Sequence, residues 1–180
     1  PDISDKFVLF AGRLATNKGL SDLISAMNLV NQKSVDLVIT GADMGLGKLL
    51  EIEALEKGVR MHRLGHIDDV TYRSVLAAAE MLVLPSEYEA FGIVLLEAAA
   101  AETAVIGTNV GGIPEAMSPG KNGLIVEYND VDNLSKSIAS LLEDSKMSEE
   151  MGIAGRLWAK NFSWDTILNE LDTEYHSIIR

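Results

Sequence analysis

An uninterrupted apolar run, Phe7-Val8-Leu9-Phe10-Ala11, leads into the glycine-bounded loop Gly12-Arg13-Leu14-Ala15-Thr16-Asn17-Lys18-Gly19. Apolar residues then recur at helical spacing over residues 20–30. The apolar run lacks the alternation of a half-exposed strand, so it is typical of a strand that is buried on both faces. A buried strand, a tight loop and an amphipathic helix in this order predict the first unit of a parallel α/β sheet.

The same alternation of apolar runs and helical patterns continues to the end of the chain. Further strand-like runs rich in Val, Ile and Leu lie at residues 35–39, 59–64, 81–84, 105–106 and 124–126. Further helical patterns lie at residues 134–142 and 164–179. Short strands joined by helical crossovers predict a doubly wound parallel sheet with helices on both faces, a Rossmann-like α/β fold. No internal repeat or flexible linker interrupts the pattern, so we expect residues 1–180 to form a single domain.

The composition is that of a folded globular chain and narrows the classes of function. Of 180 residues, 47% are hydrophobic and 23% are charged, which excludes a disordered or collagenous chain. The net charge of −12 disfavours nucleic-acid binding, because the phosphate backbone attracts a basic surface. The absence of Cys and the presence of only three His lead us to expect no disulfide, no metal centre and a cytoplasmic location. No apolar stretch reaches the roughly 20 residues of a membrane span, and the opening Pro1 indicates a piece of a longer protein.

The loop over residues 12–19 is the first candidate for chemistry, since ligands of such sheets bind at the carboxyl ends of the strands. Gly12 and Gly19 permit a tight backbone, and the helix that follows offers free N–H groups to an anion. Arg13 carries a planar guanidinium and Lys18 a mobile ammonium, a pair that suits a diphosphate. An ordinary connecting loop with two solvated cations fits the spacing equally well.

Two other glycine-rich stretches follow predicted strands. Residues 41–48, Gly-Ala-Asp-Met-Gly-Leu-Gly-Lys, resemble a phosphate loop. However, the glycine before Lys48 comes one residue too late, and Leu49 stands in place of Ser or Thr. We therefore interpret this stretch as a flexible turn between a strand and a helix. Residues 108–115 place a glycine pair before a short helix, where backbone N–H groups could hold an oxyanion, although such pairs are usually simple turns.

The helical pattern at residues 92–101, Gly-Ile-Val-Leu-Leu-Glu-Ala-Ala-Ala-Ala, contains a single charged residue, Glu97. Because the pattern is apolar on every side, we expect the helix and Glu97 to be buried. A buried carboxylate is costly unless it is paired, so either an internal salt bridge or a ligand must satisfy it. Glu89 stands just before this helix, where the helix dipole stabilises an anion and where Glu89 could form a capping box with Ser86.

Taken in order, these stretches resemble the family-four retaining glycosyltransferases. The matching motifs are Gly-Arg-x4-Lys-Gly at residues 12–19, Pro-Ser-x2-Glu-Ala-Phe-Gly-x4-Glu at residues 85–97 and Gly-Gly-Ile-Pro-Glu at residues 111–115. Members of this family have two Rossmann-like domains that face each other across a cleft, the GT-B fold. This chain is similar to the C-terminal half, which binds the nucleotide sugar. The resemblance therefore implies two partners: a nucleoside-diphosphate sugar and a missing N-terminal domain of the same chain.

The resemblance also implies roles for individual residues. Arg13 and Lys18 would grip the donor diphosphate and stabilise the leaving group. Glu89 would hold the transferred sugar, and Glu97 would accept hydrogen bonds from the ribose hydroxyls. The remaining donor contacts would come from Gly12, His66, Ile67, Phe91 and Gly92. Catalysis in this family requires neither a metal nor a cofactor.

The match is not complete. Glu102 and Ala104 stand where family members usually have Gly and Pro, and Ala90 replaces a frequent Gly. Glu-Ala-Phe-Gly at residues 89–92 differs from the Glu-Pro-Cys-Gly of glycogen and starch synthases, which favours a small or lipid-linked acceptor over a polymer. We expect the full protein to be a cytoplasmic hexosyltransferase whose only membrane contact would be through the missing domain, and the isolated domain to be inactive. The alternatives are a GT-B-type sugar-nucleotide epimerase and a non-catalytic nucleotide-binding module.

Overall fold

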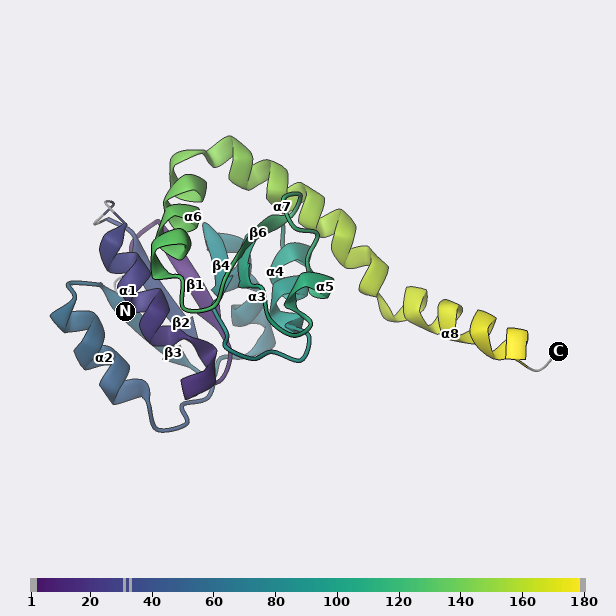
Figure 1. Cartoon of the computed structure of the whole chain (residues 1–180), viewed down its shortest axis with the longest axis horizontal. Coiled ribbons are helices and arrows are strands. Elements are labelled where there is room, and N and C mark those ends of the chain that lie inside the picture. Colours follow the sequence, from purple (N-terminus) through teal and green to yellow (C-terminus); the bar gives the residue numbers. More distant parts are fainter. Residues whose placement is uncertain (1–2, 31, 33, 179–180) are drawn as a thin grey trace.

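A computed structural model describes residues 3–30, 32 and 34–178, and a six-stranded parallel sheet forms its centre (Figure 1). The strands are β1 (Phe7–Ala11), β2 (Asp36–Thr40), β3 (Met61–Gly65), β4 (Met81–Leu84), β5 (Ala104–Thr108) and β6 (Gly123–Val126). They lie in the order β3-β2-β1-β4-β5-β6, and every neighbouring pair is parallel. The direction of strand addition therefore reverses between β1 and β4. The predicted doubly wound sheet is confirmed.

Helices cover both faces of this sheet. They are η1 (Thr16–Lys18), α1 (Leu20–Leu29), α2 (Gly47–Glu56), α3 (Asp69–Ala78), α4 (Ile93–Ala100), α5 (Ile113–Ala116), α6 (Val131–Glu143), α7 (Ser145–Ala159), η2 (Lys160–Phe162) and α8 (Trp164–Ile178). Helix α1 packs against α2 and α6 on one face, whereas α4 packs against α3 and α7 on the other (Figure 1).

The burial of the strands explains why their sequences lack alternation. Every residue of β1, β2, β4 and β5 is buried, while β3 and β6, at the two edges, are partly exposed. Strand boundaries differ slightly from the predicted ones. Strand β3 begins at Met61 rather than at residue 59, because the Val59 N–H donates to the Ala54 carbonyl at 2.8 Å and thereby closes the end of α2.

The prediction that the helix at residues 92–101 is buried all round is wrong. In α4, Leu95, Ala98 and Ala99 are buried, but Ile93 is 63% exposed and Glu97 is also exposed. One side of α4 faces the sheet and α7, and the other side is left open in this chain. Glu97 is therefore not a buried carboxylate, and burial imposes no demand for a partner on it.

The C-terminal helical pattern forms α8, which Figure 1 shows extending away from the sheet beyond η2. None of the residues described in α8 is buried, and its apolar stripe is exposed except at Ile167, which is half-buried. Ile179, which belongs to the predicted stripe, lies outside the described residues, as do Pro1 and Asp2. Within the described part of the chain, no helix combines the length and hydropathy that crossing a bilayer requires.

Candidate functional site

The loops that follow β1 and β4 meet at the point where strand order reverses. Gly19 has a φ of +64°, and a Cβ at this position would lie 1.9 Å from the carbonyl oxygen of Pro85. Only glycine therefore lets the first loop pass so close to the second. The Glu87 N–H also donates to the Asn17 carbonyl at 3.0 Å, which ties the two loops together.

This contact brings Lys18 and Glu89 into an ion pair, although they are 71 residues apart in the sequence. The Lys18 Nζ lies 2.5 Å from Glu89 Oε2, and the two side chains are only 12% and 19% exposed. Glu89 thus pairs with Lys18 instead of forming the capping box with Ser86. The buried Ser86 hydroxyl has no hydrogen-bond partner among the described residues.

A cavity of about 330 Å³ opens beside this ion pair. Six of the residues singled out in the sequence line it together: Gly12, Arg13, Lys18, Glu89, Phe91 and Gly92. The Arg13 side chain forms no ion pair with any described residue, and Arg13 is exposed. The cavity therefore holds one unpaired cation and one cation that is already shared with a carboxylate.

The N-terminus of α4 forms another wall of the same cavity. Gly92, with a φ of +88°, precedes the helix, and Ile93 and Val94 of the first turn line the cavity. The first N–H groups of a helix have no partners within it and carry about half a positive charge. Phe91 turns its ring toward η2, where the ring centroids of Phe91 and Phe162 are 5.6 Å apart. Its side chain thus anchors the loop just before α4.

Glu97 lies one turn further along α4, about 6 Å from Ile93 along the helix axis. It lines a different cavity of about 570 Å³, between α3 and α4. Glu97 Oε2 accepts a hydrogen bond of 2.7 Å from the Tyr72 hydroxyl, and no described residue forms a salt bridge with Glu97. The internal salt bridge considered from the sequence is therefore not formed within the described residues. Sequence patterns gave no signal for Tyr72, because the contact joins two helices through their packing.

His66 and Ile67 stand at the carboxyl end of β3, apart from the cavity beside Lys18. His66 is exposed and lines a third cavity of about 230 Å³ with Gly41 and Arg63. Ile67 is half-buried and lies in the connection between β3 and α3. The structure thus brings six of the nine candidate residues into one cavity and leaves His66, Ile67 and Glu97 outside it.

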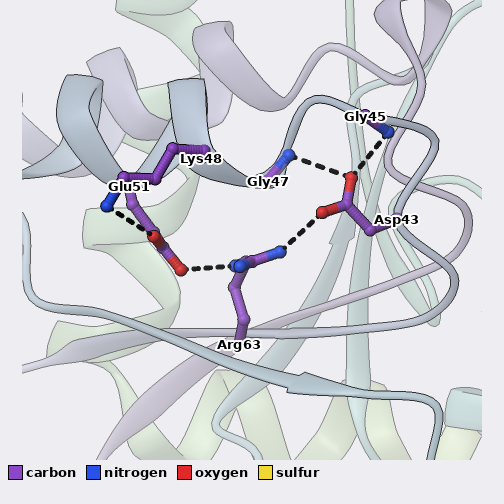
Figure 2. Close-up of polar contacts among 6 residues, drawn as sticks. All are labelled: Asp43, Gly45, Gly47, Lys48, Glu51 and Arg63. Carbon is purple, nitrogen blue, oxygen red and sulfur yellow. Dashed lines mark hydrogen bonds and ion pairs between the residues drawn. The ribbon is translucent and has the colours of Figure 1, made fainter.

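The loop at residues 41–48 is not a phosphate site, for a reason that Figure 2 shows. Asp43 Oδ1 accepts hydrogen bonds from the N–H groups of Gly45, at 2.8 Å, and Gly47, at 3.0 Å, so the amides that could bind a phosphate already hold a carboxylate. Arg63 bridges Asp43 Oδ2 at 2.8 Å and Glu51 Oε1 at 2.7 Å. The loop is thus a turn between β2 and α2, as predicted, and its own side chains satisfy its amides.

This cluster also shifts the acidity of both carboxyl groups. The Gly47 N–H, the Gly45 N–H and the Arg63 guanidinium hold the pKa of Asp43 below its usual value. The Arg63 hydrogen bond has the same effect on the pKa of Glu51, with a smaller contribution from Lys48. Both groups therefore favour their charged forms, which keeps the Arg63 bridge intact near neutral pH.

The glycine pair at residues 111–112 supports Glu89 from behind. The Gly112 N–H donates to the Glu89 carbonyl at 3.1 Å. A Cβ at Gly111 would lie 1.9 Å from that same carbonyl oxygen, and one at Gly112 would lie 2.2 Å from the Ala90 carbonyl oxygen. The backbone of the loop before α4 thus lies directly against these glycines. The Gly112 amide, which could have held an oxyanion, is used to position the loop that carries Glu89.

Comparison with known proteins identifies the family and the fold of the chain. Residues 2–158 match the model of the glycosyl transferases group 1 family. The chain belongs to this family. The resemblance drawn from the three sequence motifs is thereby confirmed, and so is the assignment of the fold to one Rossmann-like half of GT-B.

Several named relatives show the range of proteins that this group 1 domain is similar to. A glycogen synthase from Mycobacterium tuberculosis is 33% identical over 164 residues, which are 89% of this chain and 40% of that protein. A sucrose-phosphate synthase from Thermosynechococcus elongatus superposes with a TM-score of 0.85 and 31% identity, over 97% of this chain and 45% of the other. The C-terminal domain of a group 1 protein from Francisella tularensis superposes with a TM-score of 0.80 and 25% identity, over 88% of this chain and 86% of the other.

A D-inositol 3-phosphate glycosyltransferase from Corynebacterium diphtheriae is also similar, with 30% identity over 94% of this chain and 42% of that protein. The chain spans less than half the length of the curated relatives that it matches. A glycogen synthase stands among them, so likeness to relatives does not favour a small acceptor over a polymer. The preference for a small acceptor drawn from Glu-Ala-Phe-Gly stays a prediction.

Proposed function

We propose that this chain is the donor-binding half of a retaining glycosyltransferase, which moves a sugar from a nucleoside-diphosphate sugar to an acceptor hydroxyl. The observation that carries the proposal is the cavity between the ends of β1 and β4, where Arg13, Lys18 and the N-terminus of α4 converge. The chain has a net charge of −12, so this local gathering of positive groups stands out against its surroundings. Such a gathering suits a diphosphate.

The same groups would assist the reaction itself. A nucleoside diphosphate leaves with more negative charge on its terminal oxygens than it carries as a sugar ester. Positive groups that already face those oxygens stabilise the charge as it develops, without reorganisation. In this proposal Arg13 and Lys18 hold the leaving diphosphate, and the amides of the first turn of α4 face it from the opposite wall.

Glu89 would hold the transferred sugar next to the diphosphate. Its carboxylate has one oxygen on Lys18, and a carboxylate oxygen can accept further hydrogen bonds from sugar hydroxyls. The ion pair therefore couples the position of the sugar to that of the phosphates. Gly111 and Gly112 would act on the same group indirectly, through the backbone of Glu89.

The nucleoside would extend from the phosphates along α4 toward α3. Glu97, one helical turn beyond the cavity wall, would then accept hydrogen bonds from the ribose hydroxyls. His66 and Ile67, in the connection between β3 and α3, would lie beside the base. Gly12, Phe91 and Gly92 would line the phosphates and the sugar through their backbone.

The acceptor would be bound by a separate N-terminal domain of the same protein, with residues 1–180 acting as one domain. Transfer requires an acceptor hydroxyl held at near-attack distance from the anomeric carbon, with water kept out. The length of the curated relatives is consistent with such a second half.

The experiment that tests the proposal is a melting-temperature panel of the 180-residue chain with UDP, GDP and ADP. We expect one of the three to raise the melting temperature by several degrees, because a ligand at 100 times its Kd adds about 2.7 kcal/mol of stability. The Arg13→Ala and Lys18→Ala variants should lose half or more of this shift, because a tenfold higher Kd leaves only about 1.4 kcal/mol of the added stability. Lys48→Ala is the matched control, because Lys48 is an exposed lysine at the end of the loop at residues 41–48 and lies outside the cavity beside Lys18.

The possible results separate the competing interpretations. A shift that Lys48→Ala removes would place the diphosphate in the loop at residues 41–48 and overturn the proposal. Equal shifts with all three nucleotides would favour a nucleotide-binding module. In the full-length protein, conversion of the donor sugar without transfer to an acceptor would favour an epimerase.

A further inference from the structure

The carboxylate of Glu97 has one hydrogen-bonding side chain within the described residues. The Tyr72 hydroxyl, on α3, donates to Glu97 Oε2, on α4, across 2.7 Å. Arg73 lines the same cavity but forms no ion pair with Glu97. Glu97 is thus held by a neutral donor, although a cation stands nearby.

The position of Tyr72 is set by helix α3, which is fixed at both ends. Asp68 caps its N-terminus, accepting hydrogen bonds of 3.0 Å from the N–H groups of Val70 and Thr71. At the other end Leu76 is only 2% exposed, and its carbonyl accepts a buried hydrogen bond of 2.7 Å from Thr103 Oγ1. The half-buried Tyr72 ring therefore presents its hydroxyl from a rigid support.

We propose that Tyr72 is a positioning residue for the donor nucleotide, which holds the exposed Glu97 carboxylate in the orientation that accepts the ribose hydroxyls. The inference rests on the proposed function, since it takes Glu97 to be the ribose-binding group. It goes beyond that function by assigning a role to a residue outside the recognised motifs and by making the α3–α4 contact part of donor recognition.

The chemistry of the pair fits this role. A carboxylate offers about four lone-pair sites on its two oxygens, so one donor leaves room for two neighbouring ribose hydroxyls. Burial and the adjacent Glu97 carboxylate both raise the pKa of the Tyr72 phenol above its usual value. The phenol therefore stays protonated near neutral pH and remains a hydrogen-bond donor to Glu97.

The expected loss of nucleotide affinity in Tyr72→Phe follows from the rotamer freedom that the Glu97 side chain would regain. Without the phenol hydroxyl, an exposed glutamate populates several rotamers, and binding must then immobilise it. Immobilising one such side chain weakens binding by about two- to tenfold. This loss should appear only with ligands whose hydroxyls Glu97 contacts.

The test compares Tyr72→Phe with the unmodified 180-residue chain by titration calorimetry. The probes are whichever of UDP, GDP and ADP binds best and its 2′,3′-dideoxy counterpart. We expect Tyr72→Phe to weaken binding of the ribonucleotide by about two- to tenfold and to leave the dideoxy nucleotide unchanged. In the Glu97→Gln background, the same change should cause no further loss. Tyr175→Phe is the matched control, because Tyr175 is an exposed tyrosine on α8.

The outcomes are distinguishable. An equal loss with both probes, or no loss with either, overturns the role of Tyr72 while leaving the diphosphate site intact. An unmodified chain that binds both probes equally removes the ribose role of Glu97, and the inference falls with it. Should Tyr72→Phe not fold, Glu97→Asp replaces it. That variant keeps the charge but retracts it from the Tyr72 hydroxyl, and full retention of ribonucleotide affinity would equally overturn the proposal.

Discussion

Replacing Lys18 by Ala should have two effects with different physical causes. The first is a loss of stability, because Glu89 is only 19% exposed and would lose its ammonium partner at 2.5 Å. The Lys18–Glu89 ion pair is more buried than a surface ion pair and less buried than one in a protein core. Its loss should therefore lower the free energy of unfolding by about 1–3 kcal/mol. At this chain length that corresponds to a fall in melting temperature of roughly 2–12 °C.

The second effect is a loss of affinity for the diphosphate. One hydrogen bond to a charged group contributes about 1.5–3 kcal/mol, so the Kd for the nucleoside diphosphate should rise tenfold or more. Removal of Lys18 also leaves the negative charge of Glu89 uncompensated beside the phosphates. The affinity for the free nucleoside, which has no phosphates, should stay nearly constant.

The double variant Lys18→Ala/Glu89→Gln separates the two effects. An amide needs no counter-charge, so most of the lost stability should return, whereas the diphosphate affinity should stay low because the cation is still missing. Thermal unfolding and titration calorimetry on the four proteins of this cycle measure both quantities. If stability does not recover in the double variant, the ion pair is not the cause of the loss. If Lys18→Ala leaves the diphosphate affinity unchanged, Lys18 does not belong to the site.

Three further predictions follow from other parts of the molecule. Glu97→Gln should weaken ribonucleotide binding by calorimetry while the melting temperature of the empty chain stays almost the same, because Glu97 is exposed. Arg63→Gln should lower the melting temperature at pH 7 but less so near pH 3. In the folded state the pKa of Asp43 lies below its unfolded value of 3.8. The hydrogen bonds to the Asp43 carboxylate therefore stabilise the fold above pH 3.8, and this stability is lost as the pH falls through the folded-state pKa. The chain should bind a nucleoside diphosphate equally well with a chelator and with Mg²⁺, because in the proposed complex Arg13 and Lys18 neutralise the phosphates. Assays of sugar transfer by the chain alone should nevertheless show no product.

The fold could be predicted from the sequence because its central strands are buried on both faces. Such strands leave continuous runs of Val, Ile and Leu, and β1 and β4 were located in this way to the residue. Helix α4 was misjudged for a related reason. A helix that is apolar on every side is fully buried only when other elements cover each of its sides. The side of α4 that carries Ile93 is not covered in this chain, and Ile93 is 63% exposed.

The site could be predicted in part, because its motifs lie in loops whose positions the sheet dictates. Arg13, Lys18 and Glu89 follow strands that the topology makes neighbours. The Tyr72–Glu97 contact could not be predicted, because spacing within one helix does not say which residue of another helix it meets. The hydrogen bonds from the Gly45 and Gly47 N–H groups to Asp43 could not be predicted either, because a glycine pattern does not show which side chain the amides of a loop will meet.

Strand order itself decides whether the site exists. Neighbouring strands lie about 4.8 Å apart, so β1 and β4, as direct neighbours, bring their loops within reach of one ion pair. Had β4 been added beyond β3, three strand spacings, or about 14 Å, would separate the two ends. Lys18 could not then reach Glu89, although every residue and every interval in the sequence would be unchanged. The cavity beside Lys18 therefore depends on the reversal of strand order, and the sequence motifs meet in one cavity only because the chain returns to the other side of β1 after β3.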